Sequence, residues 1–247
     1  MAIQDMGGAA PGVPADALPR PAAYRTIRDE IRRLVTQAPE AADTPVPACP
    51  EWTVRETVAH LTGNCHTAIG IGIGIGAGRV GPPDPDWTRQ QVAGFRTVSL
   101  DALLAIWDEA AAELEQRWAA GATPSTLLLM DATAHRFDLG IALGEPPPHE
   151  HPVLPAMVAV VTGGFARAAA SHQLPVLRLR TDTGQEWVIG AGEPAGTVHA
   201  SRYDLFRSLT GRRTAVQIRA LDWDGDPTPW LPAFRWGPFV PPAEPTE

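Results

Sequence analysis

Apolar residues recur at helical spacing in four segments of the first 145 positions, which predicts four amphipathic helices. The second segment has a clear start, because Thr53 and Glu56, three residues later, form a capping box that satisfies backbone donors at a helix end. The last segment stops at Gly144 and the prolines after it. Such a run of helices predicts a four-helix bundle. The predicted helices run from residue 24 to the residue before Pro39, from Thr53 onward, over 100–120 and over 127–143.

The pattern changes after a proline-rich linker at residues 145–152, where one more helical segment is followed by short alternating segments. This mixture predicts a small α+β domain. The expected fold is therefore mainly α, with a disordered N-terminus at 1–21, a four-helix bundle at 22–148, an α+β domain at 152–240 and a loose tail. In the second domain we expect helices over 155–172 and 203–209 and strands over 176–180, 187–189, 197–200 and 214–220.

The composition is acidic, which argues against a nucleic-acid partner. The 247 residues carry a formal net charge of −8, and all 20 Lys and Arg positions are arginines. Nucleic-acid binding instead depends on clusters of basic residues that contact the phosphates. The N-terminus lacks a basic start and a long apolar run, so we expect no secretion signal, no membrane partner and a cytoplasmic location. His149 and His151 lie in the proline-rich linker, where we expect solvated side chains.

The two cysteines are too few for a disulfide framework and lack metal-ligand spacing. Cys49 and Cys65 are interpreted as buried free thiols, although Cys65 lies five residues after His60 and could line the same cavity. Between the second and third helices, glycine alternates with isoleucine, and once with alanine, over residues 69–78. This repeat is either an apolar flap over a cavity or a connecting segment without a chemical role.

Asp131, His135 and His60 are the candidate ligands of a divalent metal ion. Asp131 and His135 are four residues apart on one predicted helix, so their side chains leave the same side of it. That side also carries apolar residues, where a carboxylate needs a partner. His60 lies on a second helix, and three ligands with a vacant fourth position are typical of catalytic zinc. The alternative is a plain hydrogen bond between Asp131 and His135, with His60 an ordinary half-buried histidine.

Two motifs resemble those of the mycothiol-dependent maleylpyruvate isomerase family. The first is Cys-Pro-Glu-Trp-Thr-Val-Arg-Glu-Thr-Val-Ala-His-Leu at residues 49–61, and the second is Asp-Ala-Thr-Ala-His-Arg-Phe-Asp-Leu at residues 131–139, followed by Gly144. The family belongs to the DinB-like group of metal-binding four-helix bundles. Its members carry a C-terminal domain similar to sterol-carrier folds, and the order of elements agrees over most of residues 22–235.

The resemblance implies that His60, Asp131 and His135 bind zinc. The family usually has glutamate where this chain has Asp131, which is one methylene shorter. The helix must therefore stand closer to the metal, or the carboxylate must bind through water. Asp138 and Asn64 are the expected neighbours that hold the ligands in place. Asp138 could equally be an exposed acid paired with an arginine.

The resemblance also implies an enzyme that activates mycothiol on the metal, for isomerisation of an unsaturated small molecule or for S-transfer. Its C-terminal domain would wall off the site and hold an anionic substrate. Two alternatives stay open: a thiol-independent Lewis-acid enzyme of specialised metabolism, and a non-catalytic small-molecule binding protein. The candidate substrate-binding residues are Arg202, Arg212, Arg213 and Arg219.

Overall fold

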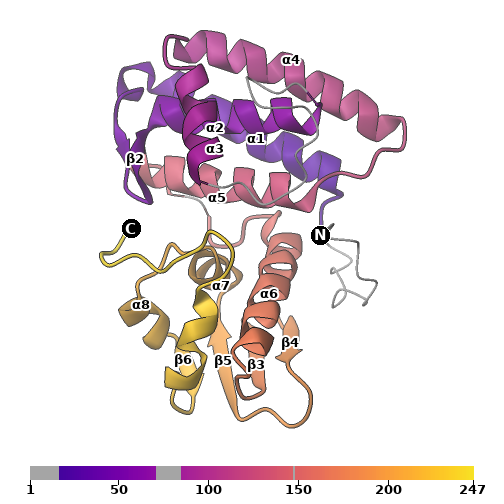
Figure 1. The fold of residues 1–247 in the computed structure, drawn as a ribbon, viewed down its shortest axis with the longest axis vertical. Helices are drawn as coiled ribbons and strands as arrows, with labels where there is room; N and C mark the ends of the chain where they lie inside the picture. The colour runs from indigo at the N-terminus through magenta and orange to yellow at the C-terminus, as the bar shows by residue number, and fades with distance from the viewer. Residues whose placement is uncertain (1–16, 71–84, 147) are drawn as a thin grey trace. The chain divides into compact units, whose positions relative to one another are not determined.

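The computed structural model describes residues 17–70, 85–146 and 148–247 (Figure 1). The chain separates into two compact units, of which the first includes Pro19–Pro147 and the second Pro148–Glu247. The first is a helical bundle and the second an α+β domain, which confirms the predicted fold class. The isoleucine-glycine repeat falls mostly outside the described residues.

Over the described residues, the bundle contains four long helices and one shorter helix. Helix α2 packs against α4 and α5, and α1 packs against α5 and α4, so each long helix buries its apolar face against two others. The buried core includes Ile27, Ile31, Val58, Leu103 and Phe137, all 0 % exposed. The helices are α1 (Arg20–Gln37), α2 (Val54–Ala68), α3 (Pro85–Gly94), α4 (Leu100–Ala119) and α5 (Thr126–Ala142), and a 3-10 turn, η1, covers Pro39–Ala41.

Side-chain caps fix the starts of three bundle helices. The predicted capping box at α2 is confirmed: Thr53 Oγ1 accepts from the Glu56 backbone N–H, and the Glu56 carboxylate accepts from the Thr53 backbone N–H. Ser99 and Ser125 cap α4 and α5, since each side-chain oxygen accepts from a backbone N–H in the first turn of its helix. Helix α1 begins at Arg20, so residues 20 and 21, which were expected to be disordered, are helical.

The connection before α2 holds a two-stranded antiparallel sheet that the sequence pattern did not predict. Strand β1 (Pro45–Val46) pairs with β2 (Cys49–Thr53), with Val46 opposite Cys49 and Pro45 opposite Thr53. Strand β2 runs directly into α2, and β1 contacts α5. The hairpin therefore places the Cys49–Thr53 segment beside both helices that carry the candidate ligands.

The α+β domain contains a four-stranded sheet in the order β4-β3-β5-β6. Strand β3 pairs antiparallel with β4 and parallel with β5, and β5 pairs antiparallel with β6. Buried side chains of β3, β4 and β5 share one face, and helix α6 packs against α7 and β4. The elements are α6 (Leu154–Ser171), β3 (Leu177–Thr181), β4 (Glu186–Ile189), β5 (Gly196–Ala200), α7 (Arg202–Leu209), α8 (Ala215–Arg219), β6 (Asp222–Asp224) and the 3-10 helix η2 (Thr228–Phe234).

Helix α8 corrects one prediction, because residues 214–220 were expected to form a strand. Thr214 and Gln217 form a second capping box, and the segment makes a short helix. Val216 and Ile218 alternate between 75 % and 1 % exposure. One helical turn with a single buried position therefore gives the same alternation as a strand.

Helix α6 is the one helix among the described residues that is long and apolar enough to cross a membrane, by length and composition alone. In the structure 61 % of that helix is buried, and it packs against α7, η2 and β4. It also makes a close approach at Gly164, where an added Cβ would lie 2.2 Å from the Trp236 ring. These contacts are those of a core helix in a folded domain.

Two predictions of exposed or loose segments are also wrong. His151 is buried, at 2 % exposure, and its Nδ1 accepts a hydrogen bond from the Val153 backbone N–H just before α6. His149 is exposed but its ring stacks on Tyr203, with centroids 4.5 Å apart. The tail is anchored, since the Thr246 hydroxyl donates to the Arg212 carbonyl at 3.0 Å.

Candidate metal centre

The three candidate ligands converge between helices α2 and α5. His60 Nε2 lies 3.2 Å from Asp131 Oδ2, and His135 Nε2 lies 3.5 Å from Asp131 Oδ1. The carboxylate of Asp131 therefore sits between the two imidazoles, and one ligand atom from each residue lies within 4.8 Å of the others. Both histidine side chains are 5 % exposed, whereas that of Asp131 is 31 % exposed. The cluster is thus accessible mainly at its carboxylate.

The electrostatics favour a negative Asp131 and a positive His135 in the metal-free state. Burial would raise the pKa of Asp131, but the His60 and His135 imidazoles hold it well below its usual value. Burial likewise opposes protonation of His135, yet Asp131, then Cys49 and Asp138, raise the pKa of its imidazole well above the usual value. These directions favour a positive charge beside the Asp131 carboxylate.

The second nitrogen of His135 is held by Asp138. His135 Nδ1 lies 3.4 Å from Asp138 Oδ2, and the Asp138 side chain is fully buried. A carboxylate at this position fixes the tautomer with hydrogen on Nδ1 and leaves Nε2 available to a ligand on the Asp131 side. Asp138 therefore lies where the expected positioning residue should be, and not at the surface.

Asn64 completes the cluster from α2, one turn after His60. Its Nδ2 donates to Asp131 Oδ2 at 2.8 Å and lies 3.0 Å from His60 Nε2. The amide holds the carboxylate at the position where it meets both imidazoles. Each helix thus contributes two residues four positions apart: residues 60 and 64 on α2 face residues 131 and 135 on α5.

Two residues of strand β2 also contact the cluster, and the sequence interpretation did not assign them to it. The Trp52 ring packs against His60 and His135, with centroids 4.7 and 5.8 Å away. Cys49 Sγ lies 3.9 Å from both His135 Nδ1 and Asp138 Oδ2. Both residues belong to the Cys-Pro-Glu-Trp motif, so the motif was visible in the sequence. Their contact with the cluster, however, depends on the hairpin that packs this segment beside the helices.

One of the two thiols differs from the expectation of buried free cysteines. Cys49 is partly exposed and Cys65 is buried, and both are free. Cys65 hydrogen-bonds with Tyr24 in the bundle core, and burial raises the pKa of its thiol to about 11. Cys49, not Cys65, therefore lies at the cluster.

The donor set fits a divalent cation. Ligands about 2.0 to 2.2 Å from a tetrahedral zinc ion lie about 3.3 to 3.6 Å from one another, close to the 3.2 and 3.5 Å separations at Asp131. The same separations suit a carboxylate hydrogen-bonded to two imidazoles. His60 Nδ1 is buried and has no hydrogen-bond partner in the described part of the chain. Cys49, His135 and Asp138 form a second group of three closely spaced ligand atoms.

The four arginines expected to bind substrate are all in the α+β domain and have partners there. Arg202 donates to Gln185, Arg212 to the Thr210 carbonyl, Arg213 to Asp204 and Arg219 to Thr228. Arg212 is buried, at 8 % exposure. Their role in holding an anionic substrate stays a prediction.

Comparisons with known proteins agree with the fold and the motifs. Residues 24–140 match the mycothiol maleylpyruvate isomerase N-terminal domain. A crystal structure of the mycothiol-dependent maleylpyruvate isomerase is similar over 84 % of this chain and 93 % of its own, with 14 % identity and a TM-score of 0.58. The crystal structure of a histidine-to-alanine mutant of that enzyme is similar over 78 % of this chain and 90 % of its own, with 15 % identity and a TM-score of 0.55.

At these identities the likeness to solved structures establishes the fold, a helical bundle followed by an α+β domain. A search of curated proteins gave no match. The match at residues 24–140 spans both motifs, including His60, Asp131 and His135. The helical domain of this chain therefore belongs to the mycothiol maleylpyruvate isomerase family.

Proposed function

We propose that this chain is a cytoplasmic mycothiol-dependent enzyme that isomerises an unsaturated small molecule or transfers the thiol to an electrophile. In this proposal His60, Asp131 and His135 hold a divalent metal ion, zinc, in the helical domain. The observation that carries the proposal is the meeting of two imidazoles and one carboxylate from two helices, within a domain of the mycothiol maleylpyruvate isomerase family.

Each residue of the cluster has a distinct part in the proposal. The two Nε2 atoms and the Asp131 carboxylate supply nitrogen and oxygen ligands, and the partly exposed carboxylate marks the side from which a thiol enters. Asp138 keeps the proton of His135 on Nδ1. Trp52 covers the imidazole faces and keeps water from them. When bound, the metal would lower the pKa of a thiol and supply a nucleophilic thiolate near neutral pH.

Asp131 is one methylene shorter than the glutamate that the family resemblance implies at this position. The carboxylate nevertheless reaches both imidazoles, at 3.2 and 3.5 Å. This supports direct coordination by a short acid over coordination through water. It also supports one shared site for all three residues.

The proposal is tested by assaying zinc-loaded protein with maleylpyruvate, with and without mycothiol. A second assay replaces maleylpyruvate with an alkylating electrophile. We expect mycothiol-dependent turnover in one of the two, lost on chelation and restored by zinc. His60→Ala should lose at least about a hundredfold in kcat/KM, because one of three metal ligands is gone.

His66→Ala is the matched control, since His66 lies on the same helix and packs near Phe95, away from the cluster. It should stay within about threefold of the unchanged chain. Turnover without thiol would favour a Lewis-acid enzyme instead. Binding of either compound without turnover would favour a binding protein.

A further inference from the structure

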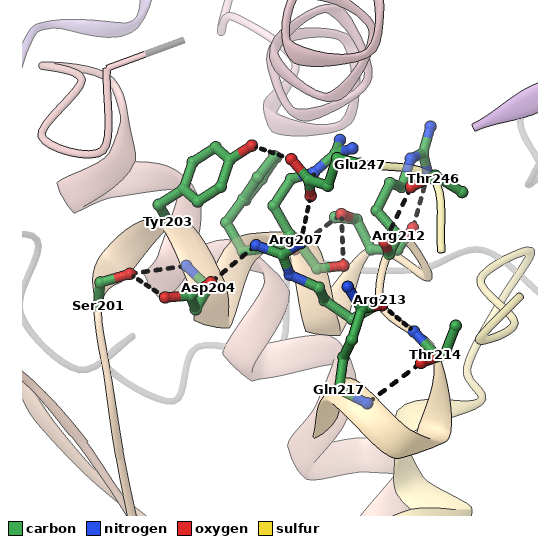
Figure 2. A network of polar contacts seen from close by, with 12 residues as sticks. Ser201, Tyr203, Asp204, Arg207, Arg212, Arg213, Thr214, Gln217, Thr246 and Glu247 are labelled. Carbon is green, nitrogen blue, oxygen red and sulfur yellow. Dashed lines mark hydrogen bonds and ion pairs between the residues drawn. The ribbon is translucent and has the colours of Figure 1, made fainter. Parts of the chain in front are cut away.

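Three side chains of the α+β domain converge on one carboxylate at the end of the described chain (Figure 2). Arg207 Nε donates to Glu247 Oε1 at 2.9 Å, and Arg213 Nη1 lies 2.8 Å from the same oxygen. The Tyr203 hydroxyl donates to Glu247 Oε2. The two carboxylate oxygens therefore have three donors, two of them cationic.

The donors are buried far more deeply than a surface ion pair. The Arg207 side chain is 0 % exposed, and those of Arg213 and Glu247 are each 14 % exposed. Burial first, and then the hydrogen bond to Glu247, raise the pKa of Tyr203, so its hydroxyl keeps its proton and donates. Buried cations need a nearby anion, and a carboxylate accepting several charged hydrogen bonds is held strongly.

The donors are also positioned by groups other than Glu247. Asp204 Oδ1 accepts from Arg213 Nη2 at 2.8 Å, and Ser201 caps the helix that carries Tyr203 and Arg207. The His149 ring stacks on the Tyr203 ring, and the Arg213 guanidinium lies over the Tyr203 ring, 5.7 Å from its centroid. Contacts within α7 and its neighbours therefore help to position these donors, in addition to the contacts with Glu247.

The tail that supplies Glu247 is anchored at a few points and is partly exposed. Residues 240–247 form no helix or strand, and residues 243–245 are exposed. Among the contacts of this segment are the Thr246 hydroxyl on the Arg212 carbonyl and the close approach of Val240 to Gly211. A short extended tail of this kind can leave its site while the domain stays folded.

From this geometry we infer that Tyr203, Arg207 and Arg213 form a carboxylate-binding site that Glu247 occupies as an intramolecular ligand, and that small free carboxylates bind there when Glu247 is withdrawn. The ligand class follows from the donors, since two guanidinium groups and a hydroxyl match the two oxygens of one carboxylate. All residues of this site belong to the α+β domain.

Chemical rescue of the full chain tests this inference. In Glu247→Ala the side-chain carboxylate is removed, and propionate, which has the same end group, is the probe. Propionate at about ten times its dissociation constant should raise the Tm of Glu247→Ala by about 3 to 6 °C. The unchanged chain should shift by less than about 1 °C, because Glu247 already fills the site.

Two controls separate a built site from a salt effect. Propionamide, the neutral analogue, should not raise the Tm of Glu247→Ala. Arg213→Ala combined with Glu247→Ala should lose most of the rescue by propionate. Equal shifts in the unchanged chain and Glu247→Ala, or rescue that survives in the double variant, would overturn the inference.

Glu247→Gln guards against a variant that does not fold. It keeps the size of the side chain and an acceptor oxygen but removes the charge, so we expect the glutamine amide to occupy the site in place of the carboxylate. We expect propionate to displace this neutral amide and raise the Tm of Glu247→Gln, by less than in Glu247→Ala. No shift in a folded Glu247→Gln, together with no shift in Glu247→Ala, would show that the arginines only anchor the tail.

Discussion

Replacing Asp138 by asparagine should weaken zinc binding without removing any proposed ligand. Asparagine keeps the shape of the side chain but removes the charge that faces His135 Nδ1. The Asp138 side chain is fully buried and its Oδ2 lies 3.4 Å from that nitrogen. Solvent therefore does not screen the interaction, and the effect should reach the metal through His135.

The magnitude follows from the hydrogen bond. A hydrogen bond to a charged group contributes about 1.5 to 3 kcal/mol, and loss of a residue that orients a metal ligand costs about 10- to 100-fold in affinity. The asparagine oxygen can still accept from Nδ1, and 3.4 Å is long for such a bond. We therefore expect the lower part of the range, a loss of about 10- to 30-fold, or about 1.4 to 2.0 kcal/mol.

Competition with a chromophoric zinc chelator at fixed pH measures this loss. The matched control is Asp108→Asn, which removes a carboxylate of the same domain that pairs with Arg32 and is 40 % exposed. That variant should bind zinc within about twofold of the unchanged chain. Asp138→Asn and Asp108→Asn affinities that agree within twofold would refute the positioning role of Asp138.

Other consequences of the structure can be measured independently. Zinc affinity should rise about tenfold per pH unit below the raised pKa of His135, because zinc must displace the Nε2 proton; an affinity that is flat with pH would contradict this. In urea unfolding, the free energy of unfolding should rise by up to about 1 kcal/mol in Gly163→Ala. In Gly164→Ala it should fall by about 1 to 3 kcal/mol, because the added Cβ clashes with the Trp236 ring. Equal effects in the two variants would argue against the close packing at Gly164. An aromatic disulfide reagent near pH 8 should modify Cys49 quickly and Cys65 slowly, since burial raises the pKa of Cys65 to about 11; two fast thiols would be inconsistent with this burial.

Local signals in the sequence predicted much of the fold. Helical spacing located the bundle helices, and the Thr53–Glu56 box fixed the start of α2. The same kind of box at Thr214 and Gln217 was present but was outweighed by the alternation of apolar residues around it. A capping box is specific to a helix start, whereas a short alternation fits one helical turn as well as a strand.

The candidate site was predictable where it depends on one helix, and less so elsewhere. The spacing of Asp131 and His135 places both on one face of α5 without any knowledge of packing. The positions of Trp52 and Cys49 depend instead on a hairpin that packs on α5, which is a tertiary contact. The anchoring of Glu247 joins residues about 40 positions apart in sequence, so no local pattern predicts it.

The most direct test of the metal centre is X-ray absorption spectroscopy of zinc-loaded protein before and after addition of mycothiol. We expect only nitrogen and oxygen ligands at about 2.0 to 2.2 Å before addition, and one sulfur ligand at about 2.3 Å afterwards. His135→Ala should bind zinc weakly and show no sulfur signal. An unchanged zinc environment on addition of mycothiol, or full zinc binding by His135→Ala, would contradict the proposed role of His60, Asp131 and His135.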